Sequence, residues 1–420
     1  GPVFSPDGRR VLFRGAPFDD PRRSNWWVAP VDGGEPWSSD VDPVEMMLDV
    51  VSCPSIWLPG RLLFVAGTTI SGINLYLASI TDDGRISGPV EPLTTGPGMT
   101  WAPTVSSNGL VALERSSWII HLWEIALDPA NGRPVGAPSR ITDDASPKFS
   151  FSLTRDGSRL AYSTYAGYRG KRRTEIHLHD RSSGEKTVPV SLATAAVSLH
   201  TRLSGDGSLL AWSAPIDGQT VSLVAPTDNP VGRELCRECT VVDFFTDGEH
   251  VLVDRGPSLS RVRIADGTET PILEMGESRR LLDTDLSRDD RWLAVQIGEP
   301  DGSAPIYAVP LDEDPVAPKE WVRIPADGYW AGAPRWSTDG NTVYYLSDRD
   351  DFICVWGQHL HPDSRMPVGE PFPVAHAHGS AMHRMPFGRG NWTLEVGGNR
   401  LVFNAEEMEG DVYTAMLAEE

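Results

Sequence analysis

A short phrase recurs along this chain of 420 residues: an apolar residue, Ser or Thr, one further residue, then Asp-Gly and an apolar stretch. Ser5-Pro6-Asp7-Gly8 is one of the fullest copies. Asp-Gly between two apolar stretches predicts a tight hairpin turn, because the Asp carboxylate accepts nearby backbone N–H groups and Gly adopts a positive φ. The copies are spaced by roughly 40 to 60 residues, which is typical of the blades of a β-propeller.

Six clear units and three degenerate ones can be recognised. They begin near residues 4, 56, 105, 153, 203, 245, 286, 336 and 396. Each unit continues with a second apolar strand and polar loops, so that it supplies enough chain for one four-stranded blade. The sequence therefore predicts an all-β fold and one domain over residues 1–420: a single closed β-propeller of eight or nine four-stranded blades.

Closure of this ring is expected where the two ends of the chain meet. The last unit offers strands near residues 392–396, 400–404 and 412–417 and no outer strand, whereas the first unit begins at once with Val3 and Phe4. Propellers avoid exposed edges when one terminus donates a strand to the blade built by the other. We therefore expect residues 4–13 to lie beside residues 392–417, at the weakest junction of the ring.

Composition limits the classes of partner. The net charge is −21, from 58 acidic and 37 basic residues. Nucleic acid is therefore not expected as a partner, since such binding rests on clustered basic residues. The one basic run, at residues 169–173, is interpreted as a solvated loop. No stretch of 18 apolar residues occurs, and we expect no membrane insertion by this chain.

Two of the four cysteines are close in the sequence. Cys236 and Cys239 form a C-x-x-C pair, which supplies only half of a tetrahedral zinc site. We favour a structural pair, either as thiols or as a local disulfide, over a metal site or a redox centre.

Histidines offer a second set of possible metal ligands. Three H-x-H pairs can each place two imidazoles on one side of a strand; they are His177/His179, His359/His361 and His376/His378. Polar positions on outer strands and loops are the favoured interpretation. The group His376, His378 and His383 is the best of these candidates, and whether it or the cysteine pair binds metal stays open. We predict no metal site and no cofactor.

Signatures of catalysis are absent from the sequence. It contains no G-x-S-x-G, H-E-x-x-H, G-x-x-x-x-G-K or G-x-G-x-x-G pattern. The Asp-Gly positions, Asp339 among them, are interpreted as turn residues. Residues 347–351, Ser-Asp-Arg-Asp-Asp, are interpreted as a loop held by an internal Asp–Arg pair, although a ligand at the mouth of the ring would meet them. No catalytic residue is predicted, and the chain is not expected to be an enzyme.

The repeat resembles the TolB-type, WD-repeat-like propeller unit of bacteria. Residues 334–350 are a near-consensus copy of that unit. Residues 365–376, followed by residues 400–404, resemble the propeller end of Acidobacteria-type proteins in which a serine/threonine kinase or winged-helix domain precedes the propeller. The resemblance implies a sensory or protein-binding domain of a larger signalling protein, fused to an upstream signalling domain and located outside the cytoplasm, in the periplasm.

The expected function is thus a non-catalytic recognition module for a protein or small-molecule ligand. Two alternatives stay open. One is a propeller enzyme, a hydrolase or lyase acting on sugars or peptides, which activity of the isolated chain or metal at His376 would favour. The other is the regulatory propeller of a prolyl-oligopeptidase-like peptidase, which requires an α/β-hydrolase domain in the same gene.

Overall fold

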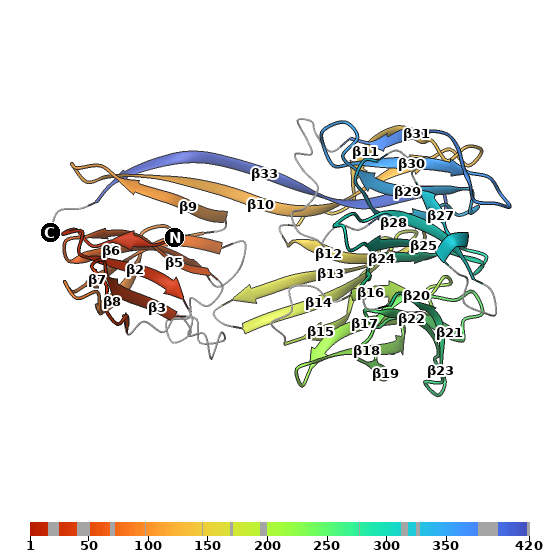
Figure 1. Cartoon of the computed structure of the whole chain (residues 1–420), viewed down its shortest axis with the longest axis horizontal. Helices are drawn as coiled ribbons and strands as arrows, with labels where there is room; N and C mark the ends of the chain where they lie inside the picture. Colours follow the sequence, from red (N-terminus) through yellow and green to blue (C-terminus); the bar gives the residue numbers. More distant parts are fainter. Residues whose placement is uncertain are drawn as a thin grey trace. The chain divides into compact units, whose positions relative to one another are not determined.

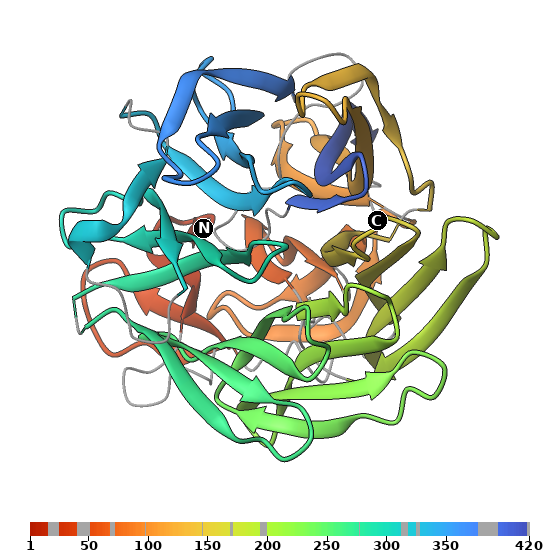
Figure 2. The same cartoon turned by 90° about the vertical axis from the view of Figure 1, so that its right-hand side faces the viewer.

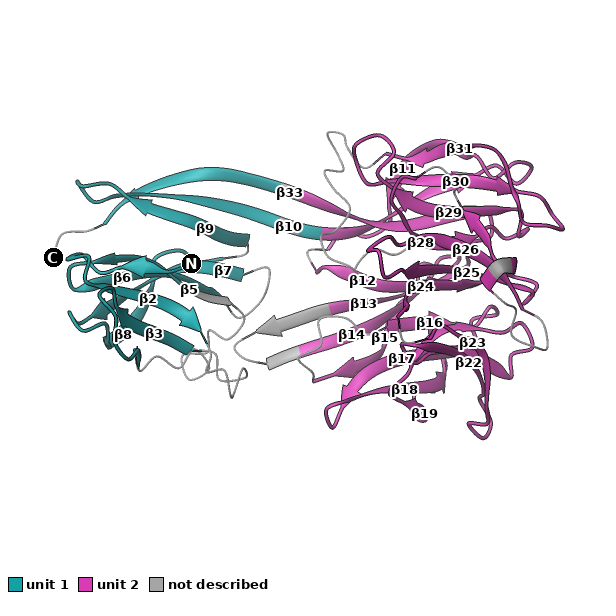
Figure 3. Cartoon of the chain, viewed as in Figure 1, with its two compact units in different colours: residues 1–119, 166–172, 408–420 teal, residues 120–165, 173–407 magenta. Residues whose placement is uncertain are grey.

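The computed structural model describes residues 1–15, 25–39, 51–67, 72–96, 98–144, 146–168, 171–193, 200–276, 278–311, 318–324, 328–376 and 394–417. The described chain consists of strands β1 to β33 and one short helix, η1 (Pro318–Glu320) (Figure 1). The expected all-β class is therefore confirmed. In place of one compact domain over residues 1–420, the chain forms two compact units (Figure 3). Unit 1 comprises residues 1–119, 166–172 and 408–420, and unit 2 comprises residues 120–165 and 173–407.

Unit 2 contains six four-stranded antiparallel sheets. Five of them follow the sequence, each with its first strand innermost and its fourth strand outermost. Their strands are β12 (Lys148–Leu153), β13 (Arg159–Tyr168), β14 (Lys171–Asp180) and β15 (Lys186–Leu192); β16 (His200–Leu203), β17 (Leu209–Ile216), β18 (Gln219–Pro226) and β19 (Arg233–Arg237); β20 (Thr240–Phe244), β21 (His250–Asp254), β22 (Ser258–Arg263) and β23 (Glu269–Glu274); β24 (Arg280–Leu286), β25 (Trp292–Gly298), β26 (Ile306–Pro310) and β27 (Val322–Ile324); and β28 (Ala331–Trp336), β29 (Thr342–Ser347), β30 (Cys354–Leu360) and β31 (Pro367–Ala375).

The sixth sheet of unit 2 combines strands that are far apart in the sequence. Its strands are β32 (Leu394–Gly397), β33 (Arg400–Met416), β10 (Leu110–Leu127) and β11 (Pro134–Arg140). They are part of a nine-stranded sheet, because the first part of β10 also pairs with β9 (Gly98–Val105). Only the first part of β33 and the second part of β10 belong to unit 2, and both long strands change unit along their length (Figure 3). The last repeat is therefore completed by the third repeat and not by the N-terminus of the chain.

The six sheets of unit 2 follow one another around an axis (Figure 2), and their innermost strands contact one another in a closed cycle: β12, β16, β20, β24, β28, β32 and again β12. Asp285 Oδ2 of β24 accepts the backbone N–H of Trp336 in β28 at 2.7 Å. The backbone N–H of Arg155 donates to the Gly205 carbonyl at 2.9 Å, and the N–H of Gly398 donates to the Arg155 carbonyl at 2.8 Å. The last of these bonds joins the sixth sheet to the first.

Unit 1 contains two further four-stranded arrangements. One is the sheet β1 (Val3–Phe4), β2 (Arg10–Gly15), β3 (Asn25–Pro30) and β4 (Trp37–Ser38). The other is β5 (Val51–Leu58), β6 (Arg61–Gly67), β7 (Gly72–Ile80) and β8 (Ile86–Pro92), and β7 also pairs in parallel with β9 (Gly98–Val105). Leu12 and Trp26 of the first pack with Trp57 and Phe64 of the second in one buried cluster.

The described strands thus form eight four-stranded arrangements, but only six of them belong to one ring. The expected eight four-stranded sheets are therefore confirmed, whereas the expectation that all of them belong to one ring is corrected. The expected neighbourhood of residues 4–13 and 392–417 is not found among the described residues either, because β1 pairs with β2, and β33 lies between β32 and β10. Residues 392 and 393 lie outside the described part. The physical reason is the length of β10 and β33, 18 and 17 residues, which lets each strand contribute to both units.

The Ser/Thr-x-Asp-Gly turns have the structure that the sequence predicts. In the turn between β16 and β17, Ser204 Oγ donates to Asp206 Oδ1 at 2.6 Å, and the same carboxylate oxygen accepts the N–H of Ser208 at 3.0 Å. Gly207 has a φ of 74°, a conformation that L-residues with a side chain rarely adopt. These bonds hold the pKa of Asp206 below its usual value, the Ser204 hydroxyl contributing most.

Asp339 makes the same contacts, and we predict a structural effect of its removal. Its carboxylate accepts the Ser337 hydroxyl at 2.6 Å and the N–H of Asn341 at 3.1 Å. Asp339→Ala is expected to lower the free energy of unfolding by about 1 kcal/mol, because the turn loses these acceptors. Denaturant unfolding measures this change. An unchanged stability combined with the loss of ligand binding would contradict the assignment of Asp339 to the turn.

Candidate functional site at the axis of unit 2

One position of the repeat supplies the side chains at the centre of unit 2. It lies two residues before the residue that opens each turn between the first two strands of a sheet. In the six sheets this position is occupied by Ser152, Arg202, Asp243, Asp285, Arg335 and Glu395, which we call the axial set. Because all six belong to innermost strands that lead into equivalent turns, their side chains meet near the axis.

Arg335 is the most deeply buried charge of the axial set, with 2% of its side chain exposed. Its Nη1 lies 3.0 Å from Asp283 Oδ1 of β24, and its Nε lies 3.4 Å from Glu395 Oε1 of β32. Burial by itself lowers the pKa of the Arg335 guanidinium, but Asp283 and Glu395 outweigh burial and raise the pKa above its usual value. One cation thus links three neighbouring sheets.

A second arginine reaches the same carboxylate from farther around the ring. Arg202 Nη1 of β16 lies 3.8 Å from Glu395 Oε1, although β12 separates these two strands in the cycle. The guanidinium of Arg202 also donates to the backbone carbonyls of Phe151 and Val242 in the two adjacent sheets. These contacts fix the position of Arg202 and place positive charge on the axis.

Two carboxyl groups of the axial set resist ionisation. Burial raises the pKa of Asp285 to about 7, against the opposing effects of Arg335 and Arg288. Burial also raises the pKa of Asp243, and here Arg288 is the strongest opposing charge. A carboxyl with a pKa near neutrality can exchange a proton at physiological pH, so the charge of the axis depends on its surroundings.

The turns above the axial set surround a cavity of 660 Å³. Its walls come from the turns after β12, β16, β20, β28 and β32 and include Arg155, Asp156, Asp206, Ser208, Phe245 and Asp247. The carboxylates of Asp156 and Asp206 belong to exposed turn residues, and Asp247 pairs with Arg261 Nη2 at 2.6 Å. The same turn motif that stabilises each sheet thus shapes the mouth of the axis.

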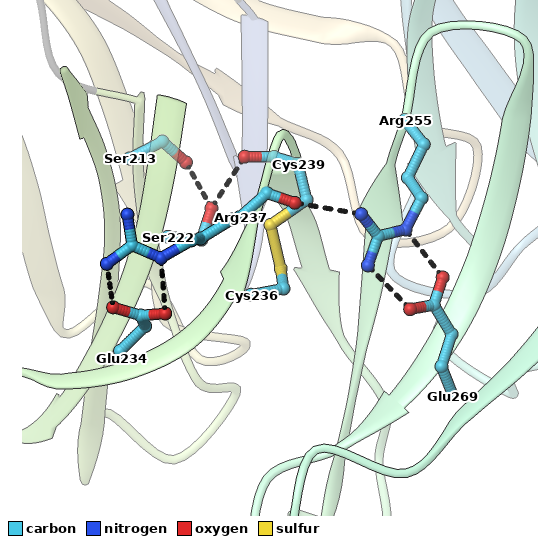
Figure 4. The surroundings of a disulfide bond; sticks show 8 residues. All are labelled: Ser213, Ser222, Glu234, Cys236, Arg237, Cys239, Arg255 and Glu269. Atoms are coloured by element: carbon cyan, nitrogen blue, oxygen red, sulfur yellow. Dashed lines mark hydrogen bonds and ion pairs between the residues drawn. A yellow bond between two sulfur atoms is a disulfide. The ribbon is translucent and has the colours of Figure 1, made fainter. Parts of the chain in front are cut away.

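The C-x-x-C pair forms a disulfide, which is one of the two structural forms that the sequence analysis favoured (Figure 4). Cys236 and Cys239 are buried, and the bond joins the end of outermost strand β19 to the start of innermost strand β20. Ser222 Oγ donates to the carbonyl of Cys239 at 2.9 Å. Arg255 Nη1 donates to the carbonyl of Arg237 at 2.9 Å, and the same guanidinium binds Glu269 (Figure 4). The connection from β19 to β20 is therefore fixed from both neighbouring sheets.

Three histidines of the predicted pairs have hydrogen-bond partners within the protein. His177 is hydrogen-bonded to Thr164 at 3.1 Å, and His359 is hydrogen-bonded to Thr342 at 3.1 Å. His361 Nδ1 accepts the backbone N–H of Asp363 at 3.3 Å. These bonds agree with the interpretation of the histidines as polar strand and loop residues. His378 and His383 lie outside the described residues.

His376 has different surroundings. Its Nδ1 lies 2.8 Å from Asp350 Oδ2, and the Cys354 sulfur belongs to the same group, whose donor atoms all lie within 4.8 Å of one another. Residues 348–353 connect β29 and β30, so residues 348–351 lie in a loop as expected, whereas Ser347 is the last residue of β29. Arg349 of this loop lies over the rings of Tyr329 and Trp356. Of the basic run, Lys171 to Arg173 begin β14, whereas residues 169 and 170 lie outside the described part.

Sequence reasoning missed the axial set and the contact between Cys354 and His376. A signal for the axial set does exist, because five of its six members are charged residues inside apolar inner strands at one fixed distance from the turn. For Cys354 and His376 no local pattern exists, since the residues are 22 apart and meet only through strand pairing.

No protein-family model and no curated protein matches this chain. Among solved structures, it is similar to a putative TolB from Agrobacterium tumefaciens, with a TM-score of 0.51 and 15% identity over 69% of this chain and 99% of that chain. TolB from Acinetobacter baumannii gives a TM-score of 0.45 and 14% identity over 72% and 79% of the two chains. The first of these similarities shows a TolB-type propeller fold, which the sequence resemblance also implied.

In the ranges that the structure describes, no helix has the length and apolar character needed to cross a membrane.

Proposed function

We propose that the chain is a non-catalytic recognition module, and that the cavity at the mouth of unit 2 binds a segment of a partner protein that carries basic side chains. The observation that supports this proposal most strongly is the 660 Å³ cavity above the charged axial set. Concave sites of this size, with a few convergent polar groups, are typical of ligand binding.

The chemistry of the cavity favours a cationic ligand. Asp156 and Asp206 expose carboxylates at its rim, and Phe245 supplies an apolar wall. The net charge of −21 attracts basic partners at long range. In this proposal, one basic side chain of the partner enters the mouth and pairs with the carboxylates of Asp156 and Asp206.

We further propose that the module lies outside the cytoplasm and serves as the sensory or protein-binding domain of a larger bacterial signalling protein with an upstream signalling domain. The disulfide between Cys236 and Cys239 supports this location, because such bonds persist in oxidising compartments. The proposed location and the proposed binding site are independent, and the experiment below tests only the site.

The test uses a displayed random peptide library selected on the intact chain. We expect the selected peptides to be rich in Lys and Arg and to bind wild type measurably by fluorescence anisotropy. Ser208 is exposed and lines the cavity. Ser208→Arg adds bulk and positive charge there, so it should weaken peptide binding at least about tenfold.

Ser303→Arg is the matched control. Ser303 donates its N–H and its hydroxyl to Asp301, just as Ser208 does to Asp206, but it lies in the loop between β25 and β26 and does not line the cavity. This variant should bind like wild type. Equal binding by Ser208→Arg and wild type, or selection of acidic peptides, would refute the proposed site. Cleavage of the selected peptides would favour an enzyme instead.

A further inference from the structure

We infer that Asp350, Cys354 and His376 form a binding site for a divalent transition metal such as Zn²⁺, at the end of the sheet β28–β31. Thiolate, imidazole and carboxylate are the ligands that zinc takes in proteins. Their donor atoms lie within 4.8 Å of one another. This site is separate from the cavity proposed for the partner, and neither proposal depends on the other.

Strand pairing brings two of the ligands together. Val355 of β30 pairs with Ala375 of β31 in the antiparallel ladder. Continuing that register by one step places Cys354 opposite His376. Side chains at such opposite positions have Cβ atoms about 5 Å apart, which suits two ligands of one ion. The third ligand comes from the loop between β29 and β30, which carries Asp350.

The donor atoms lie within 4.8 Å of one another and must adjust to accept an ion. Tetrahedral zinc with bonds of about 2.0–2.3 Å sets its ligand atoms about 3.3–3.7 Å apart. Asp350 Oδ2 and His376 Nδ1 are 2.8 Å apart, so the ion would separate them by about half an ångström. Three protein ligands leave a fourth position for water or another donor, as in zinc sites that are not closed.

The charges of the three ligands also match the ion. A Cys354 thiolate and an Asp350 carboxylate carry two negative charges, and His376 binds as neutral imidazole. Their sum balances the two positive charges of Zn²⁺. Binding displaces the thiol proton of Cys354, so metal affinity should rise with pH.

The exposure of the three ligands determines how a metal ion reaches this site, and the nearest positive charge affects how tightly the ion binds. The Cys354 side chain is fully buried, whereas 47% of the His376 side chain and 25% of the Asp350 side chain are exposed. An ion therefore enters from the His376 side. The nearest cation of the same loop is Arg349, whose guanidinium lies 5.4 Å from the Trp356 ring centre, and Trp356 in turn contacts the His376 ring. Stacking on Trp356 holds the Arg349 guanidinium in place, and its repulsion of a bound cation lowers the affinity of the site for the metal.

The experiment titrates the intact, metal-stripped chain with Co²⁺ and then Zn²⁺. Bound Co²⁺ should give a thiolate-to-metal charge-transfer band together with tetrahedral d–d bands, and one equivalent of Zn²⁺ should abolish both. Cys354→Ser should remove the charge-transfer band. Asp350→Asn and His376→Ala, at partly exposed positions, should weaken binding at least about tenfold without loss of the folded circular dichroism spectrum.

Two controls separate this site from other ligands in the chain. His361→Ala removes an exposed histidine of the same sheet and should leave the Co²⁺ spectrum unchanged. The double variant Cys236→Ser, Cys239→Ser removes the disulfide cysteines and should leave the spectrum unchanged as well. Absence of a charge-transfer band in the wild type, or its persistence in Cys354→Ser, would overturn the inference. Equal affinity of wild type and His376→Ala would also overturn it.

Discussion

Arg335→Ala is expected to lower the free energy of unfolding of unit 2 by about 3–5 kcal/mol, because the substitution leaves buried carboxylates without their cation. Glu395 has 8% of its side chain exposed and Asp283 has 22%, and both contact Arg335 directly. Hydrogen exchange of amides in β24, β28 and β32 measures the change. This method reports on unit 2 itself, whereas a chain with two compact units need not unfold in one transition.

Arg263→Ala serves as the control for Arg335→Ala. Arg263 pairs with Asp266 at 3.4 Å, with half of each side chain exposed, and its removal should change stability by less than about 1 kcal/mol. The double variant Arg335→Met, Glu395→Gln should destabilise less than the sum of its single changes, since it removes both members of a buried pair. An effect of Arg335→Ala as small as that of Arg263→Ala would contradict the role of Arg335 in linking three sheets.

The turns could be predicted from sequence because their determinants are local. Ser204, Asp206 and Gly207 are consecutive or nearly so, and their hydrogen bonds connect residues no more than five apart. Even the copy that lacks Gly keeps the turn, because Asp290 adopts a φ of 57° in its place. The strands that follow each turn are apolar and pair with their sequence neighbours. The strands that make up most of the sheets could therefore also be predicted from the sequence.

The division into two units could not be predicted in the same way. The alternation along β10 is that of an ordinary strand, and nothing local specifies that its second half joins β11 on one side and β33 on the other. Which strand pairs with the edge of a sheet depends on the apolar surface that the whole sheet buries when the pair forms. Trp123 and Ile125 of β10, for example, pack with Leu394 and Phe403 in one buried cluster. A count of repeats therefore gives the number of sheets but not the ring to which each belongs.

The candidate site depends on both kinds of information. The fixed distance between the axial set and the turns is readable from the repeat, and the charged members were visible as isolated polar residues in apolar strands. Their mutual contacts were not readable, because Arg335 and Glu395 are 60 residues apart and meet only when the ring closes. The pKa of Asp285 follows from that closure, since closure buries the carboxyl among other charges.

Asp285→Asn is expected to make unit 2 more stable than wild type at pH 8, by up to about 4 kcal/mol, and to have little effect below pH 4. Burial raises the pKa of Asp285 to about 7 in the folded chain, and an unfolded Asp titrates near its model value of 3.8. Between these values the folded state binds the additional proton, so this group stabilises the fold at low pH and its contribution is lost as pH rises to about 7. Asn is a neutral isostere whose side-chain oxygen can still accept the N–H of Trp336.

The measurement compares the two proteins across pH 3 to 8 by hydrogen exchange and denaturant unfolding, and the difference between them isolates Asp285. Other titratable groups affect the stability of both proteins, so their contributions cancel in this difference. The pKa of His200 is lowered to about 4, chiefly by desolvation and then by Arg202, and this group makes stability rise with pH over part of the same interval. Asp206→Asn provides a control of opposite sign, because the pKa of Asp206 is lowered by the bonds of its turn, and its loss should destabilise the fold at pH 8. If Asp285→Asn were less stable than wild type at pH 8, with the same difference at pH 4, Asp285 would be an ionised partner of Arg335 and not a carboxyl kept neutral by burial.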